Sequence, residues 1–188
     1  MRKRIVIIHG SYGNSTENWF PWLARQVRAL GHEAILPDFP TPEHQTLKNW
    51  LRVFDSEIGK LTPNVVLIGH SLGVAFILRI LELTKQPIAG SFLVSAFLGR
   101  LGLPDFDKVN ADFVTKPVNW KRVRAAAGIV RVYNGDNDPY VPLSKGREIA
   151  KGLGVDLTVI KGGGHINAAA GYTQFPELLQ DLKGLRLV

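Results

Sequence analysis

Five residues, Gly69-His70-Ser71-Leu72-Gly73, constrain this chain more than any other stretch, because two apolar runs of different period flank them. Residues 64–68 form a short, almost wholly aliphatic run, which is typical of a parallel strand buried on both faces. Residues 74–83 carry apolar side chains at helical spacing with almost no polar face, which predicts a largely buried helix. The chain should therefore pass from a buried strand through a sharp turn into a buried helix.

A Gly-x-Ser-x-Gly pentapeptide between such a strand and such a helix is typical of a turn that presents a nucleophilic serine. Gly69 and Gly73 leave room where the strand and the helix cross, since a Cβ would clash there. Ser71 is expected in strained backbone geometry, with its hydroxyl above the sheet edge and the positive end of the helix beneath it. The plainer alternative is a serine that only caps a buried helix.

The length and composition are those of one globular domain. The chain has 188 residues, of which 45% are hydrophobic and 21% charged, so it can bury a core without metal or disulfide support. We expect a single domain over residues 1–188. The absence of cysteine excludes disulfides, thiolate zinc sites and a cysteine nucleophile. No run reaches the ~18 apolar residues of a membrane span or forms a signal peptide, so we expect a cytoplasmic protein with no membrane partner.

The net charge of +7 and a pI of about 9.8 raise the question of a nucleic-acid partner. The basic residues are scattered, however, with only short clusters at residues 2–4 and 121–122, and no recognition motif accompanies them. We therefore expect a solvated basic surface and no nucleic-acid partner. A monomer and a weak dimer both remain open.

Short apolar runs alternate with helical patterns along the chain. Strands are expected within residues 4–9, 33–36, 64–68, 91–95, 127–134 and 156–161, and helices within 17–30, 43–58, 74–83, 143–153 and 176–182. This alternation predicts an α/β fold with a mostly parallel sheet of about six strands and helices on both faces. Residues 97–124 have poor periodicity and are assigned to no element, although Phe97, Phe106 and Phe113 could reach over the site.

A glycine-rich loop at residues 9–14 follows the first expected strand. In an open parallel sheet, ligands bind at the carboxyl ends of the strands, where this loop would lie. Such a loop can direct a backbone N–H at a developing oxyanion. We expect the N–H of Ser11 or Tyr12 to do so, together with the N–H of Leu72. The alternative is that the glycines of this loop only make the turn.

A serine hydroxyl needs a base to take its proton, and the base needs a carboxylate to orient it. His165 is the preferred base, because it follows the last strand and three glycines that can bring its ring back over the sheet edge. The other histidines are His9, His32, His44 and His70. For the carboxylate, Asp138 is favoured because Pro139 stiffens its turn, whereas Asp136 would satisfy backbone N–H groups. The order serine, aspartate, histidine is the one expected of α/β-hydrolases.

Aromatic side chains close to these loops are candidates for substrate contacts. Tyr12 and Tyr140 stand in the loops themselves. Trp19 lies next to the glycine-rich loop, and Phe97 follows the expected strand at residues 91–95. Aromatic residues at helical spacing are more often part of a core, so Trp19 has that alternative too.

The segments at residues 69–73, 138–142 and 163–165 together resemble the small α/β-hydrolase family that contains retinoblastoma-binding protein 9 and the bacterial YdeN-type serine hydrolases. Residues 18–23 and 94–97 extend the resemblance over nearly the whole chain. It implies a compact α/β-hydrolase-like three-layer sandwich without a large lid domain, and Ser71, Asp138 and His165 as the triad. The retinoblastoma-binding motif of the animal member needs a cysteine, so that partner is not implied.

The expected reaction is acyl transfer by a carboxylesterase-like serine hydrolase on a small-molecule ester or related acyl substrate. Ser71 would attack the carbonyl and form an acyl-enzyme, with no metal or organic cofactor required. Thioesterase or aminopeptidase activity at the same site is one alternative. A non-catalytic protein-binding module is another, although its signature would be a broken triad. The short chain leaves little room for a lid, which argues against a lipase.

Overall fold

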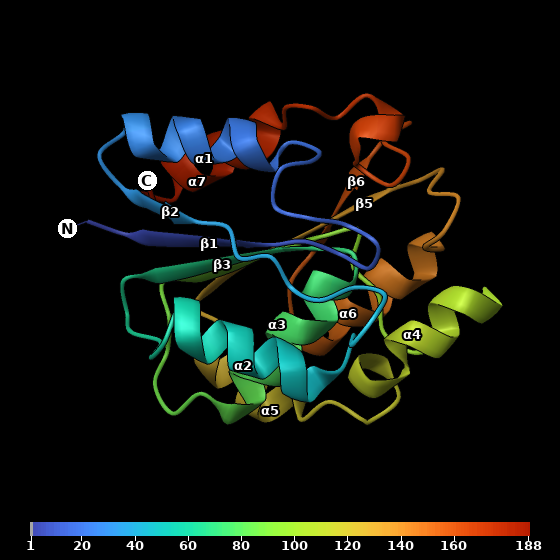
Figure 1. Ribbon diagram of the computed structural model, residues 1–188. Helices are drawn as coiled ribbons and strands as arrows, with labels where there is room; N and C mark the ends of the chain where they lie inside the picture. The colour runs from blue at the N-terminus through green and yellow to red at the C-terminus, as the bar shows by residue number, and fades with distance from the viewer. Residues whose placement is uncertain (1) are drawn as a thin grey trace.

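The computed structural model describes residues 2–188, in which six strands alternate with helices (Figure 1). The strands are β1 (Arg4–Ile8), β2 (Glu33–Ile35), β3 (Val65–His70), β4 (Gly90–Val94), β5 (Ile129–Gly135) and β6 (Leu157–Ile160). The helices are α1 (Phe20–Ala29), α2 (Leu47–Glu57), α3 (Leu72–Leu83), α4 (Pro104–Val114), α5 (Trp120–Ala126), α6 (Leu143–Leu153) and α7 (Pro176–Gly184), with a 3-10 turn, η1 (Ala168–Ala170).

The sheet has the strand order β2-β1-β3-β4-β5-β6, and every neighbouring pair is parallel. The chain builds the sheet outward in one direction from β1 to β2 and then in the other direction from β3 to β6. Strands β1 and β3 are in register with Ile8 opposite Gly69, so their carboxyl ends lie side by side. An open parallel sheet binds ligands at such a reversal of strand order.

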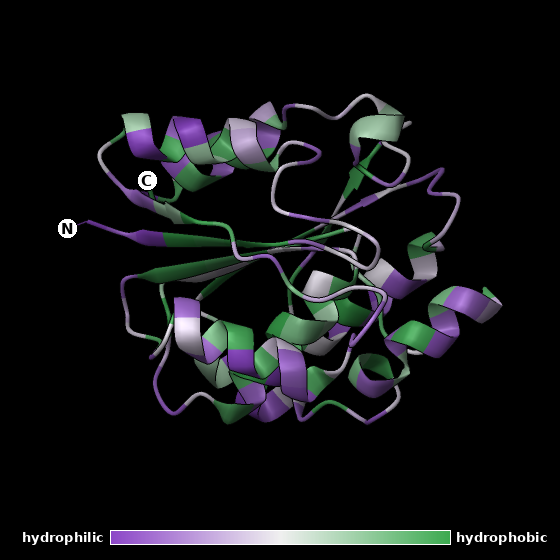
Figure 2. Ribbon diagram, in the orientation of Figure 1, coloured by the Kyte–Doolittle hydropathy of each residue, from purple (hydrophilic) through white to green (hydrophobic). Residues whose placement is uncertain are grey.

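Helices cover both faces of the sheet and make three layers. Figure 1 shows α1 and α7 on one face and α2, α3 and α5 on the other. Ile5 and Ile7 of β1 belong to the core on the α1 side, whereas Val6 and Ile8 belong to the core on the α3 side. Figure 2 shows the strands mostly in the hydrophobic colour and the outer sides of the helices in the hydrophilic one. The predicted three-layer α/β sandwich without a large lid domain is confirmed.

Helix α3 is the central helix of this core. Its residues from Leu72 to Leu81 are all buried, as its lack of a polar face predicted. It begins directly after β3, and its first residues cross the carboxyl end of β1. An idealised Cβ on Gly73 would lie 2.4 Å from the carbonyl oxygen of Ile8 and 2.8 Å from that of His9. Only glycine allows this contact between the helix and β1.

Residues 97–124, which the sequence left unassigned, contain helix α4 and most of helix α5, which ends at Ala126. Helix α4 buries only Asn110, Phe113 and Val114, and α5 buries only Val123 and Ala126. So few buried positions give no clear apolar stripe, which explains why periodicity did not reveal these helices. Helix α1 also begins later than expected, at Phe20 rather than residue 17. No helix within residues 2–188 has the length and apolar character needed to cross a membrane.

We expect Gly73→Ala to lower the free energy of unfolding by at least about 2 kcal/mol, because the added methyl group meets rigid backbone rather than a flexible side chain. Equilibrium unfolding in urea measures this. Gly184→Ala at the end of α7 is the matched control, since nothing lies within 4 Å of the added Cβ there. An equal loss of stability in both variants would contradict the crossing as the cause.

Candidate active site

Ser71 occupies the sharp turn between β3 and α3. Its backbone has φ 55° and ψ −120°, a conformation that an L-residue adopts only under strain. Its N–H donates to the carbonyl oxygen of Val94, 2.9 Å away, which ties the turn to β4. A capping serine has extended backbone geometry and accepts a hydrogen bond from the helix, but Ser71 makes no such side-chain bond. The turn therefore presents the hydroxyl rather than using it as a cap.

His165 and Asp138 form a hydrogen-bonded pair. The Nδ1–H of His165 donates to Oδ2 of Asp138 at 2.7 Å, and the Asp138 side chain is completely buried. The other carboxylate oxygen, Oδ1, accepts the N–H groups of Tyr140 and Val141 at 2.9 and 3.0 Å. With Nδ1 used in this way, Nε2 is the ring nitrogen of His165 that can accept a proton.

The loop after β5 also fixes the loop that carries His165. Oδ1 of Asp136 accepts the N–H of Gly162, and Oδ1 of Asn137 accepts the N–H of Gly164, both at 2.7 Å. The structure thus places Asp138 on His165, whereas Asp136 supports the backbone of the neighbouring loop. The two loops come from β5 and β6, which are neighbours in the sheet.

Ser71 and His165 line one cavity of about 340 Å³ at the carboxyl ends of the strands. The other lining residues are Gly10, Ser11, Tyr12, Glu17, Asn18, His70, Tyr140, Asn167, Ala168 and Ala169. A larger hollow of about 630 Å³ lies between the carboxyl-terminal ends of α2 and α3 and contains no residue of the predicted triad. No cluster of metal-ligating side chains occurs within residues 2–188.

The loop after β1 passes directly against the serine. An idealised Cβ on Gly10 would lie 2.8 Å from Cβ and 3.3 Å from Oγ of Ser71, so a larger residue would crowd the hydroxyl. The N–H of Tyr12 donates to Oγ1 of Thr41 at 2.7 Å and is therefore occupied. Of the two expected oxyanion donors in this loop, the geometry favours Ser11 over Tyr12. Leu72, as the first residue of α3, has no acceptor within its helix for its own N–H.

A buried polar network holds Ser11. Its hydroxyl donates to Oδ1 of Asn110 at 2.5 Å, and Nε2 of Gln45 donates to the same hydroxyl and to the same Oδ1 at 3.1 and 3.0 Å. Asn110 comes from α4, whereas Gln45 precedes α2. Sequence reasoning missed both residues, because nothing local in the chain indicates that two amides 65 positions apart meet on one loop.

A second pair of donors holds the backbone of His165. The Nε2–H of His70 and the hydroxyl of Ser95 both donate to the carbonyl oxygen of His165, at 2.8 and 2.9 Å. Both side chains are buried. Burial, with the nearby ring of His165, lowers the pKa of His70 to about 3, so His70 is a neutral donor here. The sequence placed His70 beside the serine but did not indicate this contact.

His9 is a structural residue rather than a base. Its Nδ1–H donates to the carbonyl oxygen of Gly10 at 2.8 Å, and its Nε2 accepts the N–H of Phe39 at 2.9 Å. Burial lowers the pKa of His9, which favours this neutral, two-bond arrangement. His9 therefore fixes the start of the loop that lies against Ser71.

Two of the four aromatic residues predicted to contact substrate do not line the cavity, so that prediction was wrong for Trp19 and Phe97. Trp19 is fully buried beside α1, and its indole N–H donates to the carbonyl oxygen of Ile166 at 3.0 Å. Phe97 is buried in the core on the α3 side. Tyr12 and Tyr140 do line the cavity and are 48% and 40% exposed.

Phe106 of α4 packs against both of these tyrosines. Its ring centroid lies 5.3 Å from that of Tyr12 and 5.8 Å from that of Tyr140. Tyr140 in turn lies against the ring of His165, with centroids 5.1 Å apart. These three aromatic residues, here called the aromatic mouth, come from three separate segments of the chain.

Comparison with known proteins places the whole chain in one group. A family model described as serine hydrolase matches residues 5–184. This chain belongs to the serine hydrolase family. The putative hydrolase YdeN of Bacillus subtilis is 32% identical over 179 residues, which are 94% of this chain and 92% of that protein. The serine hydrolase RBBP9 of Rattus norvegicus is 25% identical over 185 residues, 97% of this chain and 95% of that protein.

Solved structures agree with the fold of this serine hydrolase. The crystal structure of the ydeN gene product from Bacillus subtilis superimposes with a TM-score of 0.90 at 30% identity, covering 97% of this chain and 98% of that one. A polyneuridine aldehyde esterase mutant gives a TM-score of 0.70 at 14% identity, with coverage of 98% and 99%, and so shares the fold. The family resemblance read from the sequence is confirmed.

We expect His70 to make the stability of this hydrolase depend on pH. An unfolded histidine has a pKa near 6.5, whereas that of His70 in the folded protein is about 3. Between these values the unfolded chain binds a proton that the folded protein does not, so the unfolding free energy falls with falling pH, by up to about 1.4 kcal/mol per unit. The stability is fully present above pH 6.5 and is lost progressively below it.

His70→Gln should therefore show a shallower loss of unfolding free energy than wild type between about pH 6.5 and pH 4.5 in urea titrations. His9 contributes to the slope of both proteins and cancels in the comparison. Ser56→Ala on the exposed face of α2, which removes no titratable group, should keep the wild-type slope. Identical slopes for His70→Gln and wild type would contradict the neutral, buried state of His70.

Proposed function

We propose that this serine hydrolase is carboxylesterase-like and hydrolyses small esters through a Ser71–His165–Asp138 triad. The single observation that carries the proposal is the 2.7 Å hydrogen bond between His165 and the buried Asp138, on the same cavity as the strained Ser71. Chain order and local structure agree with it, since each residue follows a different parallel strand at its carboxyl end.

In the proposed mechanism, Oγ of Ser71 attacks the ester carbonyl while Nε2 of His165 takes its proton. Asp138 holds the ring in the tautomer with Nδ1 protonated and stabilises the imidazolium that forms. The N–H groups of Leu72 and Ser11 would bind the oxyanion, each contributing about 3 kcal/mol. His165 then protonates the leaving alcohol, and water attacks the acyl-enzyme with His165 as the base.

The size and lining of the cavity support a small acyl substrate. Its volume of about 340 Å³ is near the lower end of ligand pockets. The aromatic mouth offers apolar surface to one part of the substrate. No metal or organic cofactor takes part in the proposed steps, and a small molecule rather than nucleic acid or membrane is the proposed partner. The cytoplasmic location and the choice between monomer and weak dimer stay predictions.

Thioesterase or aminopeptidase activity at the same site remains the alternative within the same chemistry. A non-catalytic binding module on this fold is the alternative from another class. The positive φ of Ser71 argues against a binding module, because strain of this kind costs roughly 1–3 kcal/mol and needs a compensating use.

Hydrolysis of p-nitrophenyl esters from acetate to octanoate tests the proposal. We expect kcat/KM to be highest for the acetyl to butanoyl esters and to fall for octanoate, because the cavity is small. Ser71→Ala should lower kcat by at least about 10³-fold, since no other group replaces the nucleophile. A Ser71→Ala protein that keeps wild-type turnover would contradict the nucleophile. Wild-type protein with neither turnover nor labelling of Ser71 by a fluorophosphonate would favour the binding module.

Ser95 has a positioning role in this proposal, because its hydroxyl is one of the two donors to the carbonyl oxygen of His165; the other is His70. We expect Ser95→Ala to lower kcat on the best ester by about 10-fold with KM nearly unchanged, because one lost hydrogen bond of roughly 1–1.5 kcal/mol loosens the base and not the cavity. Ser56→Ala on the exposed face of α2 makes the same chemical change away from the site and should leave kcat unchanged. A change in KM alone would argue against positioning.

A further inference from the structure

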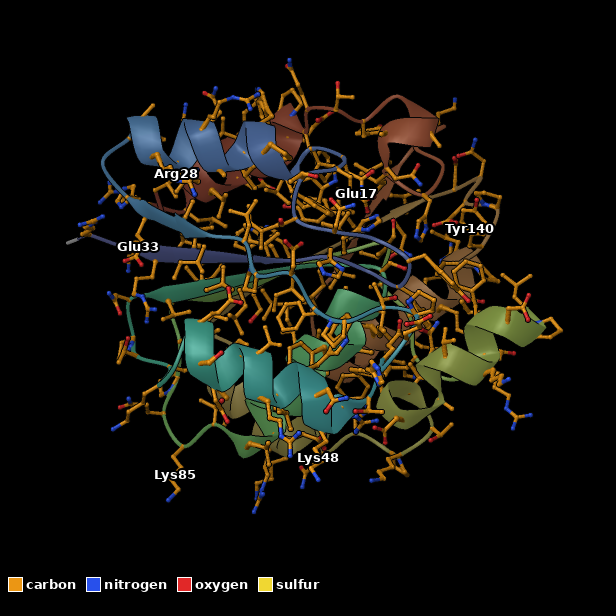
Figure 3. All side chains as sticks on the ribbon, in the orientation of Figure 1. Glu17, Arg28, Glu33, Lys48, Lys85 and Tyr140 are labelled. Atoms are coloured by element: carbon orange, nitrogen blue, oxygen red, sulfur yellow. The ribbon has the colours of Figure 1, made fainter. Side chains whose placement is uncertain are left out.

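Glu17 is the single Asp, Glu, Lys or Arg side chain among the residues that line the cavity. It lies in the loop between β1 and α1, and Figure 3 shows it toward the end of the sheet where Tyr140 also lies. Asn18 and Asn167 line the same cavity beside it. The site thus has a polar side with one carboxylate, in addition to the aromatic mouth.

Glu17 lies against the same loop that borders the nucleophile. Its Oε1 lies 2.4 Å from an idealised Cβ on Gly13, and the same Cβ would lie 3.2 Å from the carbonyl oxygen of Gly10. Gly10 in turn lies directly against Ser71, as described above. The carboxylate therefore packs on the loop that borders the reacting hydroxyl, and a substrate on Ser71 would be within its field.

No lysine or arginine forms an ion pair with Glu17 within residues 2–188, although the chain has 23 basic and 16 acidic residues. Its hydrogen-bond partners are Nδ2 of Asn18, at 3.2 Å, and the backbone of Asn14. Burial raises the pKa of Glu17, which means that its charged form has lost part of its hydration without gaining a cation. Such a carboxylate gains most from a cation that the ligand brings.

We propose that Glu17 forms a subsite for a positively charged group of the substrate, so that this esterase prefers esters carrying an ammonium group. The inference rests on the proposed function and names the substrate class of the same site. A free carboxylate near a developing oxyanion opposes its formation, and a substrate cation next to Glu17 removes that opposition. The cation could belong to the acyl part or to the alcohol part, and the shared chemistry is the ammonium group.

Two pairs of isosteric esters distinguish these sources. The p-nitrophenyl esters of β-alanine and butanoic acid differ by an ammonium in place of a methyl group in the acyl part. Butanoylcholine and 3,3-dimethylbutyl butanoate differ by a trimethylammonium group in place of a tert-butyl group in the alcohol part. For each pair the measured quantity is the ratio of kcat/KM for the charged ester to that for the neutral one. Comparing this ratio between variants cancels the difference in intrinsic ester reactivity.

We expect Glu17→Gln to lower this ratio by about 10-fold in at least one pair. The reason is that the attraction between a carboxylate and an ammonium group a few ångströms apart at the protein surface stabilises the charged ester by an amount of that order. Glu17→Asp should keep most of the wild-type ratio, since it keeps the charge. Glu57→Gln, an exposed position on α2, makes the same change in net charge and should keep the ratio within about twofold. Unchanged ratios for Glu17→Gln in both pairs would overturn the inference.

A binding measurement decides the inference without turnover. The Ser71→Ala protein is titrated with β-alaninamide and with butanamide, its neutral isostere, and followed by NMR. Tighter binding of β-alaninamide that disappears in the Ser71→Ala, Glu17→Gln protein supports the subsite even if no ester is hydrolysed, in which case the proposed function alone fails. Equal binding of the two amides, with ester turnover intact and ratios unchanged, leaves the proposed function standing and rejects the subsite.

Discussion

The contact between the start of α3 and the end of β1 is the constraint on which the site depends. At Gly73 the helix approaches the carbonyl oxygens of Ile8 and His9 more closely than any side chain would allow. This approach places the positive helix end under Ser71 and brings Gly10 against the serine. The packing of these two backbone segments thus positions the nucleophile, the helix end and the oxyanion loop. A shift of α3 would displace all three together.

Hydrogen bonds to loop backbone then convert this packing into a defined geometry. The carbonyl of His165 has two buried donors, and the carboxylate of Asp138 accepts two backbone N–H groups besides the ring of His165. The bonds of His70, Ser95 and Asp138 to His165 join segments from different strands, whereas the two N–H bonds to Asp138 lie within its own loop. Loops of this kind have little apolar burial of their own, so their polar networks, fully paired in a low-dielectric setting, supply the rigidity that acyl transfer requires.

Much of this arrangement could be predicted from the sequence, and the failures have physical causes. The aliphatic run before Gly69 and the apolar helix after it identified β3, α3 and the strained turn, because both elements are buried all round. Helices α4 and α5 were not predicted, since they bury few residues and one of these, Asn110, is polar. Trp19 was wrongly expected at the substrate because the direction of a side chain beside a loop is decided by packing, here against Phe20 and Phe175.

The residues that the sequence could not reveal share one property, which is that their partners are distant in the chain. Ser95 reaches the carbonyl of His165 across 70 positions, and Asn110 reaches Ser11 across 99. Glu17 differs, because its proposed role depends on the absence of a basic partner. In a chain of net charge +7, it is the one Asp, Glu, Lys or Arg residue that lines the cavity, and its negative charge is opposite in sign to the net charge of the chain. The overall charge of a protein acts at long range on encounter, whereas an unpaired charge inside a cavity acts on whatever is bound. Selectivity at this site is therefore governed by Glu17 rather than by the basic surface.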